Sequence, residues 1–274
     1  MTRLLLTFLL SLMTLYSVAQ NRLTIVELNA ENLFDARHDT LKNDYEFLPT
    51  SPRHWTRAKY WEKLNRTGQT LISCGEDSRG WQLPDLVGLC EVENDSVLFD
   101  LTKRSLLRNA RYEYVMTSSL DIRGIDVALL YSPFSFRLLK ADTIRVSLIA
   151  DMRPTRDILH VEGAIANGDT LHVLLLHAPS RTGGEIYSRP FRKHVIKQVS
   201  NVVDSIQKYQ VHAKIIVMGD FNDYADSPSL KPLYECGLLN VSAQAKGKNG
   251  AEGTYRYHGE WGSLDQILIS DNLR

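Results

Sequence analysis

The chain has only three cysteines, no excess charge of either sign, and no long hydrophobic run after its first 19 residues. Cys74, Cys90 and Cys236 cannot all pair internally and do not have metal-ligand spacing, which argues against a disulfide-rich scaffold and against a zinc site. We expect mostly buried thiols and at most one disulfide. Lys plus Arg and Asp plus Glu both number 32, so no overall field draws the chain to nucleic acid or membrane, although a local basic patch would suffice.

Residues 1–19 predict a secretory signal peptide. They combine a basic Arg3, an apolar stretch over residues 4–15, and small residues Ser17 and Ala19 spaced as at a cleavage site. The alternative is a membrane anchor, but the apolar core is short for a spanning helix, and no cysteine follows it to carry a lipid. We therefore expect a secreted or periplasmic protein that has no membrane attachment after cleavage.

Residues 20–274 predict one α/β domain. A hydrophobic fraction of 43% and a charged fraction of 23% are ordinary for a globular protein of this length, and no repeat or linker divides the chain. Helices are expected at 56–72, 96–108 and 185–209, and nothing indicates an oligomer, so a monomer is expected. Short apolar runs predict strands at 23–28, 86–89, 112–117, 126–131, 136–140, 143–148, 158–165, 170–176, 214–218 and 264–269.

Five of the expected strands carry polar side chains at one end. Any one of these residues has an ordinary structural explanation, as a turn former or a helix-dipole partner. Side chains two positions apart on extended backbone point the same way, so together they predict one rim of a cleft. The residues are Asn29 and Glu31, Glu91 and Glu93, His177, Asp220 and Asn222, and Asp265.

Carboxylates, carboxamides and one imidazole suit a particular chemistry. Hard oxygen donors without a Cys/His cluster favour Mg²⁺, Mn²⁺ or Ca²⁺ over Zn²⁺. A dication neutralises the non-bridging oxygens of a phosphoester, while a carboxylate orients or deprotonates the attacking water. The pattern therefore predicts metal-dependent hydrolysis of a phosphodiester.

The ordered motifs "LNAENLFD", "GLCEVEN", "RGIDVALLY", "LLLHAPSR", "MGDFND" and "WGSLDQILIS" span nearly the whole mature chain. Together they resemble the endonuclease/exonuclease/phosphatase superfamily, which includes deoxyribonuclease I, and most of all a secreted bacterial nuclease-like branch. "GDFND" after an apolar strand is the most specific of them. The resemblance implies a four-layer α/β sandwich, in which two mixed β-sheets pack face to face with helices outside.

The resemblance also implies roles for residues of this chain. Asp220 would position and activate the attacking water, and Asn222 would hold the phosphate and its transition state. Glu91 would bind the divalent metal, which is Mg²⁺ or Mn²⁺ with Ca²⁺ as a further possibility. Asn29 and Glu31 would lie beside that metal as ligands or in support of it.

Further roles fall on the imidazole and on two other motifs. His177 would hydrogen-bond the phosphate or protonate the leaving oxygen, and Asp265 would orient a second histidine. Arg123 would pair with a phosphate oxygen, although a surface ion pair explains it almost as well. Asp126 has no assigned role. Glu93 is ambiguous, because "EVE" spacing places it on the side of Glu91 while the following residues suggest a helix start.

One departure from the family pattern stands out. The family ends on a strand with a Ser-Asp-His motif, whereas only "DNLR" follows "SLDQILIS" here, and no histidine lies beyond His258. We expect the domain of residues 20–274 to be without its C-terminal strand, because the loss of that strand exposes a sheet edge that an intact protein avoids. The alternative is a complete but inactive relative.

Two segments bear on the substrate. "RHWTRAKYWEK" (53–63) and the expected hairpin "GTYRYHGEW" (253–261) mix basic and aromatic residues, which hold phosphates and stack on bases or sugars. A helix with a solvated basic face and a packed aromatic face explains the first segment equally well. The expected function is a secreted endonuclease acting on DNA, and RNA is left open as a further substrate. The alternatives are a phosphoesterase for lipid headgroups or inositol phosphates, and a non-catalytic nucleic-acid-binding relative.

Overall fold

The computed structural model describes residues 22–78 and 80–274, so the predicted signal peptide lies outside the described residues. The apolar runs form strands of up to nine residues, and β14 shows the most regular alternation of buried and partly buried positions. The strands are β1 (Ile25–Leu33), β2 (Glu76–Asp77), β3 (Gly80–Trp81), β4 (Leu86–Val92), β5 (Glu113–Met116), β6 (Asp126–Tyr131), β7 (Phe136–Ile144), β8 (Ile158–Ile165), β9 (Thr170–His177), β10 (Lys214–Asp220), β11 (Leu238–Asn240), β12 (Tyr255–Tyr257), β13 (Glu260–Gly262) and β14 (Asp265–Ser270).

The helices follow the expected amphipathic segments. Thr56 caps the first helix by accepting a hydrogen bond from the Lys59 backbone N–H, and Tyr60, Leu64 and Leu71 form its buried stripe. The α-helices are α2 (Arg57–Ser73), α3 (Asp95–Phe99), α4 (Glu185–Tyr209) and α5 (Lys231–Glu235). Shorter turns are η1 (Tyr45–Phe47), the π-helical η2 (Asp100–Arg104), η3 (Leu106–Asn109), η4 (Lys248–Gly250) and η5 (Asp271–Leu273).

Two mixed sheets form the centre of the fold. The first has the strand order β1-β4-β6-β5, with β1 and β4 parallel and the other neighbours antiparallel. The second has the order β11-β14-β10-β9-β8-β7, in which β9 and β10 are the parallel pair. Because parallel strands end at the same edge, β1 and β4 bring their carboxyl ends together, and so do β9 and β10.

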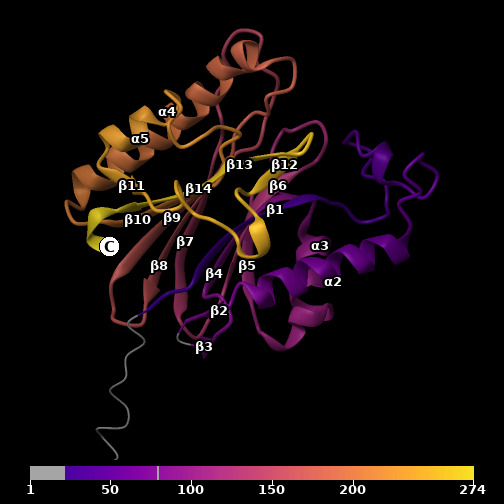
Figure 1. The fold of residues 1–274 in the computed structure, drawn as a ribbon, viewed down its shortest axis with the longest axis horizontal. Coiled ribbons are helices and arrows are strands. Elements are labelled where there is room, and N and C mark those ends of the chain that lie inside the picture. Colours follow the sequence, from indigo (N-terminus) through magenta and orange to yellow (C-terminus); the bar gives the residue numbers. More distant parts are fainter. Residues whose placement is uncertain (1–21, 79) are drawn as a thin grey trace, which may run out of the picture.

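The fold has four layers, and an apolar core fills each of the three spaces between them. One lies between the two sheets and includes Leu129, Leu175 and Met218. A second packs α2 and α3 against the first sheet, and a third packs α4 and α5 against the second sheet. Figure 1 shows the same order, with α4 and α5 on one side of the sheets and α2 and α3 on the other. The expected four-layer α/β sandwich is confirmed.

Two expected elements are wrong. The strands expected at 136–140 and 143–148 are a single strand, β7, which a register irregularity near Leu139 interrupts and which ends at Ile144. The helix expected at 96–108 breaks into α3, η2 and η3, because Ser105 adopts an extended conformation. The Ser105 hydroxyl donates to the Leu101 carbonyl and accepts from the Leu107 N–H, which gives the backbone an alternative to a continuous helix.

The cysteines are all free, so no disulfide joins them. Cys90 is buried and Cys236 is partly buried, as expected, but Cys74 is exposed, which corrects the expectation for that residue. Among the described helices, none is both long and apolar enough to cross a bilayer.

β1 lies at the edge of the first sheet, where β4 is its strand neighbour in the described part of the chain. An edge strand presents backbone N–H and C=O groups that a further strand can use. The sequence-based hypothesis that a further strand of the family pattern belongs to this domain stays a prediction.

Candidate active site

The polar side chains at the strand ends lie on the same faces of the two sheets as the core between the sheets. His177 follows Leu175 on β9, and Asp220 follows Met218 on β10, with the same two-residue spacing. Leu175 and Met218 belong to the core between the sheets, so the two polar residues lie at the top of that same layer. Asp265 opens the antiparallel strand β14 directly opposite Asp220. The site therefore forms where the inter-sheet core ends.

The backbone at this rim departs from extended geometry. Glu31, Asn32, Glu91 and Asn222 have φ values of 53°, 63°, 61° and 50°, in the left-handed region that L-residues seldom occupy. The register of β1 against β4 and of β4 against β6 shifts at these positions, as it does at β-bulges. Such outliers gather at functional sites, where surrounding packing maintains them.

This geometry corrects the expectation that residues two apart share one side. Asn29 points inward and Glu31 is exposed, because the left-handed backbone at Glu31 turns its side chain elsewhere. Glu93 leaves the rim in the same way and accepts a hydrogen bond from the Asp35 N–H at 2.7 Å. Burial, followed by the Asp35 carboxylate, raises the pKa of Glu93 to about 8. Glu93 therefore ties down the segment after β1 and does not face Glu91.

Asp220 is the most connected residue of the rim. Its Oδ2 accepts a hydrogen bond from Asn29 Nδ2 at 3.0 Å and lies 3.5 Å from His177 Nε2. Its Oδ1 accepts the Asn222 backbone N–H at 2.7 Å. Burial, and then the Asp265 carboxylate, raise the pKa of Asp220 above its ordinary value. A buried carboxyl whose pKa is raised in this way is suited to accept a proton near neutral pH.

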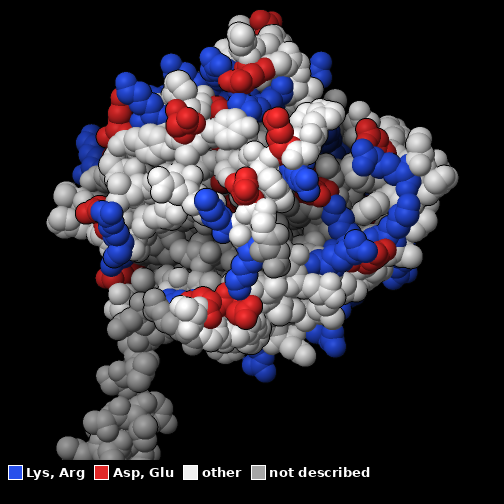
Figure 2. Space-filling view, in the orientation of Figure 1, with Lys and Arg blue, Asp and Glu red and all other residues white. Residues whose placement is uncertain are grey.

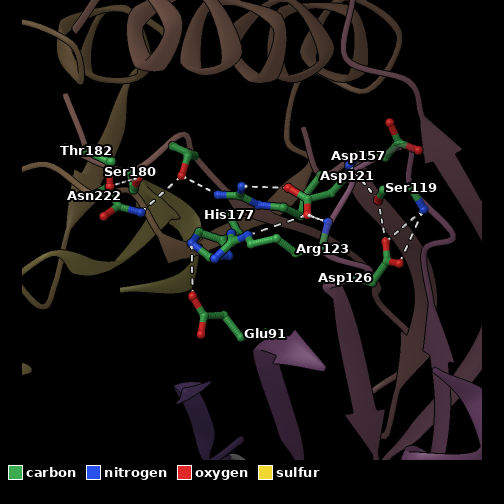
Figure 3. Close-up of polar contacts among 12 residues, drawn as sticks. Glu91, Ser119, Asp121, Arg123, Asp126, Asp157, His177, Ser180, Thr182 and Asn222 are labelled. Carbon is green, nitrogen blue, oxygen red and sulfur yellow. Dashed lines mark hydrogen bonds and ion pairs between the residues drawn. The ribbon is translucent and has the colours of Figure 1, made fainter. Parts of the chain in front are cut away.

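His177 is 3% exposed and faces two carboxylates. Its Nε2 lies 3.9 Å from Glu91 Oε1, and its Nδ1 has no hydrogen-bond partner among the described residues (Figure 3). Burial, followed by the positive charges of Arg156 and Arg123, lowers the pKa of His177 well below its ordinary value. This shift favours the neutral imidazole, which can donate a hydrogen bond.

Gly219 allows β10 to place Asp220. Its φ is +143°, and a Cβ at this position would lie 1.9 Å from the Leu176 carbonyl oxygen on β9. Because that neighbour is backbone, it cannot move aside without breaking the pairing of the two strands. The glycine of "GDFND" is thus required by the close approach of β9 and β10 just below the site.

The sequence did not reveal Arg156, a buried arginine behind the rim. Its Nη2 donates to the Ala178 carbonyl at 2.7 Å, and its Nη1 pairs with Asp121 Oδ2 at 3.2 Å. Asn222 Nδ2 donates to the same Ala178 carbonyl at 3.0 Å, as the chain of dashed lines in Figure 3 shows. Arg156 therefore fixes the segment after His177 and, through it, Asn222. The arginine is 5% exposed. Arginine is seldom fully buried, so its burial is what marks it as important, and burial is known only from the structure.

Asp265 has no histidine partner among the described residues, so its expected role of orienting a second histidine stays a prediction. Its side chain interacts with Thr254 and with Glu27, and its Oδ1 is buried without a hydrogen-bond partner among the described residues. Burial, and then the Asp265 and Asp220 carboxylates, raise the pKa of Glu27 well above its ordinary value. Glu27 was not predicted as a site residue. A charged residue within the apolar run "TIVELN" could have indicated it, because such a residue needs a polar group opposite it.

The "RGID" motif divides into two parts. Arg123 lies at the rim with its side chain partly exposed, and its Nε is 3.7 Å from Asp121 Oδ1, so it is free to reach a phosphate and also forms the expected ion pair. Asp126 is buried and accepts hydrogen bonds from Thr117 Oγ1, from the Ser119 N–H and from the Ser119 hydroxyl. Asp126 therefore holds the strand end together and does not face the site.

A groove of about 1430 Å³ opens above these residues. The rim residues Asn29, Glu31, Glu91, Arg123, His177, Asp220, Asn222 and Asp265 all line it. One wall is α2 with the segment before it, and the other is the β12–β13 hairpin. Figure 2 shows Lys and Arg side chains gathered over the first of these walls, on the right of the view. The structure thus brings all of the predicted rim residues except Glu93 to one groove.

The donor set fits a hydrated Mg²⁺ or Mn²⁺. Among the described residues no three His, Cys, Asp or Glu side chains are arranged as a closed cage. Mg²⁺ needs no such cage, since it keeps several waters and binds through one or two carboxylates and the substrate phosphate. Glu91 and the partnerless Oδ1 of Asp265 supply carboxylate oxygens, and a dication would relieve the repulsion between these two groups.

The family model described as the endonuclease/exonuclease/phosphatase family matches residues 24–274. The chain belongs to the endonuclease/exonuclease/phosphatase family. Members of this family are hydrolases that act on phosphoester bonds and generally use divalent metals. The search of curated proteins returned no significant match.

Solved structures of the endonuclease/exonuclease/phosphatase family share the fold. A family protein from Bacteroides thetaiotaomicron superposes with a TM-score of 0.63 at 15% identity, over 91% of this chain and 83% of that one. A mannosyl-6-phosphatase of Bacteroides thetaiotaomicron gives 0.61 at 15% identity, over 91% and 86%. D. rerio TDP2 complexed with a single-strand DNA product gives 0.55 at 18% identity, over 92% and 84%.

Proposed function

We propose that the protein is a secreted, divalent-metal-dependent phosphodiesterase that cleaves DNA, with RNA as a second substrate. The carrying observation is the convergence of Asn29, Glu91, His177 and Asp220 from both sheets at the floor of one groove. The groove is open enough for a polymer and has a basic wall, which suits a polyanionic substrate.

The chemistry divides among the residues of the rim. Glu91 and Asp265, with Asn29 and Glu31 nearby, would hold the dication, which neutralises the non-bridging phosphate oxygens when it is bound. Asp220 accepts the proton of the attacking water, since its pKa is raised and Asn29 fixes its orientation. The neutral imidazole of His177 donates a hydrogen bond to a phosphate oxygen. Protonation of the leaving oxygen by His177 stays the alternative role.

Plasmid nicking tests this function. Purified mature protein is incubated with supercoiled plasmid and Mg²⁺, and a parallel reaction contains EDTA. We expect relaxed plasmid only in the Mg²⁺ reaction, and a Glu91→Gln variant that needs more Mg²⁺ for half-maximal cleavage. Cleavage that persists in EDTA, or a Mg²⁺ titration unchanged by Glu91→Gln, contradicts the metal assignment.

A second candidate is a phosphatase for sugar phosphates. It is favoured by the structural likeness to a mannosyl-6-phosphatase and by the aromatic hairpin at the groove, since aromatic faces pack against sugar rings as well as bases. Release of inorganic phosphate from a sugar 6-phosphate, with plasmid left intact, would favour this candidate over a nuclease. The lipid-headgroup, inositol-phosphate and non-catalytic hypotheses have no separate support from the groove.

A further inference from the structure

The β12–β13 hairpin presents an aromatic surface to the groove. His258 and Gly259 both have positive φ values, as a two-residue type I′ turn requires, and this turn brings Tyr257 opposite Glu260. Tyr255 and Tyr257 lie on one face of the hairpin with ring centroids 6.0 Å apart and planes within 13°. They remain 43% and 61% exposed, and both line the groove.

Tyr255 is the nearer of the two rings to the catalytic rim. The Asp220 and Glu31 carboxylates are among the causes, after burial, that raise the pKa of Tyr255. Tyr257 lies two residues further along the strand, on the same face. The two rings therefore form a row that leads away from the catalytic carboxylate, at a spacing suited to successive flat groups of a substrate.

The opposite wall is basic and has little free aromatic surface. In the segment 53–63, Tyr60 is buried and Trp61 packs against the core of the first sheet. Lys59 and Lys63 line the groove, and Lys63 Nζ donates to the Glu31 carbonyl at the rim. Arg66 also lines it, with its side chain 74% exposed and paired at 2.6 Å with Glu62, which lines the groove too. Trp55 lines the groove as well, but it is partly buried against the same core. The aromatic residues of this segment are therefore mainly packed, and the segment contributes Lys59 and Lys63 as positive charge.

We infer that the groove selects single-stranded nucleic acid, with the phosphates along α2 and unpaired bases stacked on Tyr255 and Tyr257. This inference rests on the proposed function, because it concerns the same site. In a duplex the bases stack on one another and show only their edges, so tyrosine faces on a groove wall have no base face to contact. An unpaired strand exposes those faces, and stacking on aromatic side chains is its usual mode of binding. The volume exceeds the 300–1000 Å³ typical of small-molecule sites, which leaves room for several nucleotides.

Binding measurements separate this inference from the proposed catalysis. A fluorescein-labelled oligothymidylate and a labelled duplex of equal length are titrated in Mg²⁺ with the Asp220→Asn variant, in which turnover is blocked. We expect the single strand to bind at least about tenfold more tightly than the duplex. We expect Tyr257→Ala, added to that variant, to weaken single-strand binding on the order of tenfold and to leave duplex binding unchanged.

A basic-wall variant and matched controls complete the test. Lys59→Ala should lower the slope of log affinity against log salt by roughly 0.7 for the single strand, the value for one lost phosphate contact. Tyr209→Ala and Lys208→Ala change an exposed Tyr–Lys pair at the end of α4, outside the groove lining, and should change nothing. Equal binding of the two probes, binding of neither, or an unchanged affinity in Tyr257→Ala overturns the inference.

Hydrolysis of bis(p-nitrophenyl) phosphate by the native chain is measured in parallel. This small diester contains no bases and no polymer backbone, so its hydrolysis reports the chemistry of the rim without requiring a bound strand. Loss of strand selectivity with intact hydrolysis removes the inference but keeps the proposed function. Strand-selective binding without hydrolysis of any phosphoester removes the proposed catalysis but keeps the binding site.

Discussion

Two buried histidines on the same strand, His172 and His177 of β9, have opposite surroundings. His172 lies with its Nδ1 3.1 Å from His160 Nε2 and its Nε2 3.1 Å from Gln210 Oε1, so both ring nitrogens are hydrogen-bonded. His177, five residues along and on the other face of the sheet, has a partnerless Nδ1 and an Nε2 that faces carboxylates at 3.5 and 3.9 Å.

The difference separates a histidine that is paired within the protein from one that is not. Buried polar groups are normally paired within the protein, so a buried imidazole with an unused nitrogen is unusual. Together with the Nε2 that faces the rim carboxylates, this marks His177 as the candidate for the proposed function. From the sequence alone the two residues look alike, since each is a histidine next to an apolar run.

The largest effect on cleavage is expected from removing the Asp220 carboxylate, one of the two that His177 faces. Asp220→Ala should lower plasmid cleavage by about 10⁴-fold, the upper range for loss of a general base. The fold should persist, because the change also removes repulsion between buried carboxylates. Steady-state nicking rates and a thermal melt check both points. Asp226→Ala, at a nearby exposed aspartate, is the control and should cleave normally.

His177→Ala should lower cleavage by roughly 10²–10³-fold, as expected when one hydrogen-bond donor to the transition state is lost. Its thermal midpoint should fall less than that of His172→Ala, since no protein partner is left unpaired at Nδ1. The two variants are compared in the same melting and nicking assays. If His177→Ala unfolds the protein as readily as His172→Ala, the contrast between the two histidines is wrong.

His172→Ala should do the reverse and leave the cleavage rate within about twofold. The change strips His160 and Gln210 of their shared partner, and each lost hydrogen bond of this part-buried kind costs about 1 kcal/mol of the free energy of unfolding. Urea denaturation measures that loss. A cleavage rate reduced as strongly as in His177→Ala would show that the two ends of β9 are not independent.

The smallest effect is a pH dependence of stability that originates beside His172. Burial, followed by the charge of His172, lowers the pKa of His160 below its ordinary value. The unfolded chain therefore takes up a proton below about pH 6.5 while the folded chain does not, so the free energy of unfolding falls as pH drops, by at most about 1.4 kcal/mol per unit. Urea denaturation between pH 7.5 and 5.5 should show a steeper fall in the native chain than in His160→Gln.

Several elements were predictable because their causes are local. The expected helix at 185–209 coincides with α4, since Val195, Val199 and Val203 repeat with helical spacing and are all buried. The inward direction of His177 and Asp220 also follows from alternation, because β9 and β10 remain extended up to these residues.

Other parts of the site were not predictable, because their causes lie elsewhere in the chain. Glu91 and Asn222 have left-handed backbone. The side chains before and after them therefore do not point to opposite faces in turn, as they would along an extended strand. Glu27 and Arg156 gain significance only from what lies opposite them, which is Asp265 for the first and the Ala178 carbonyl for the second. No pattern within a single strand identifies such a partner.

The sequence by itself determined the class of chemistry, because strand-end carboxylates, carboxamides and an imidazole are visible in short stretches and match one family along the chain. The tertiary structure decided which of them act together. Asn29 meets Asp220 across 191 residues of sequence, and α2 faces a hairpin that begins at Tyr255. These pairings come from the packing of two sheets against one apolar core, a long-range interaction that no local pattern encodes.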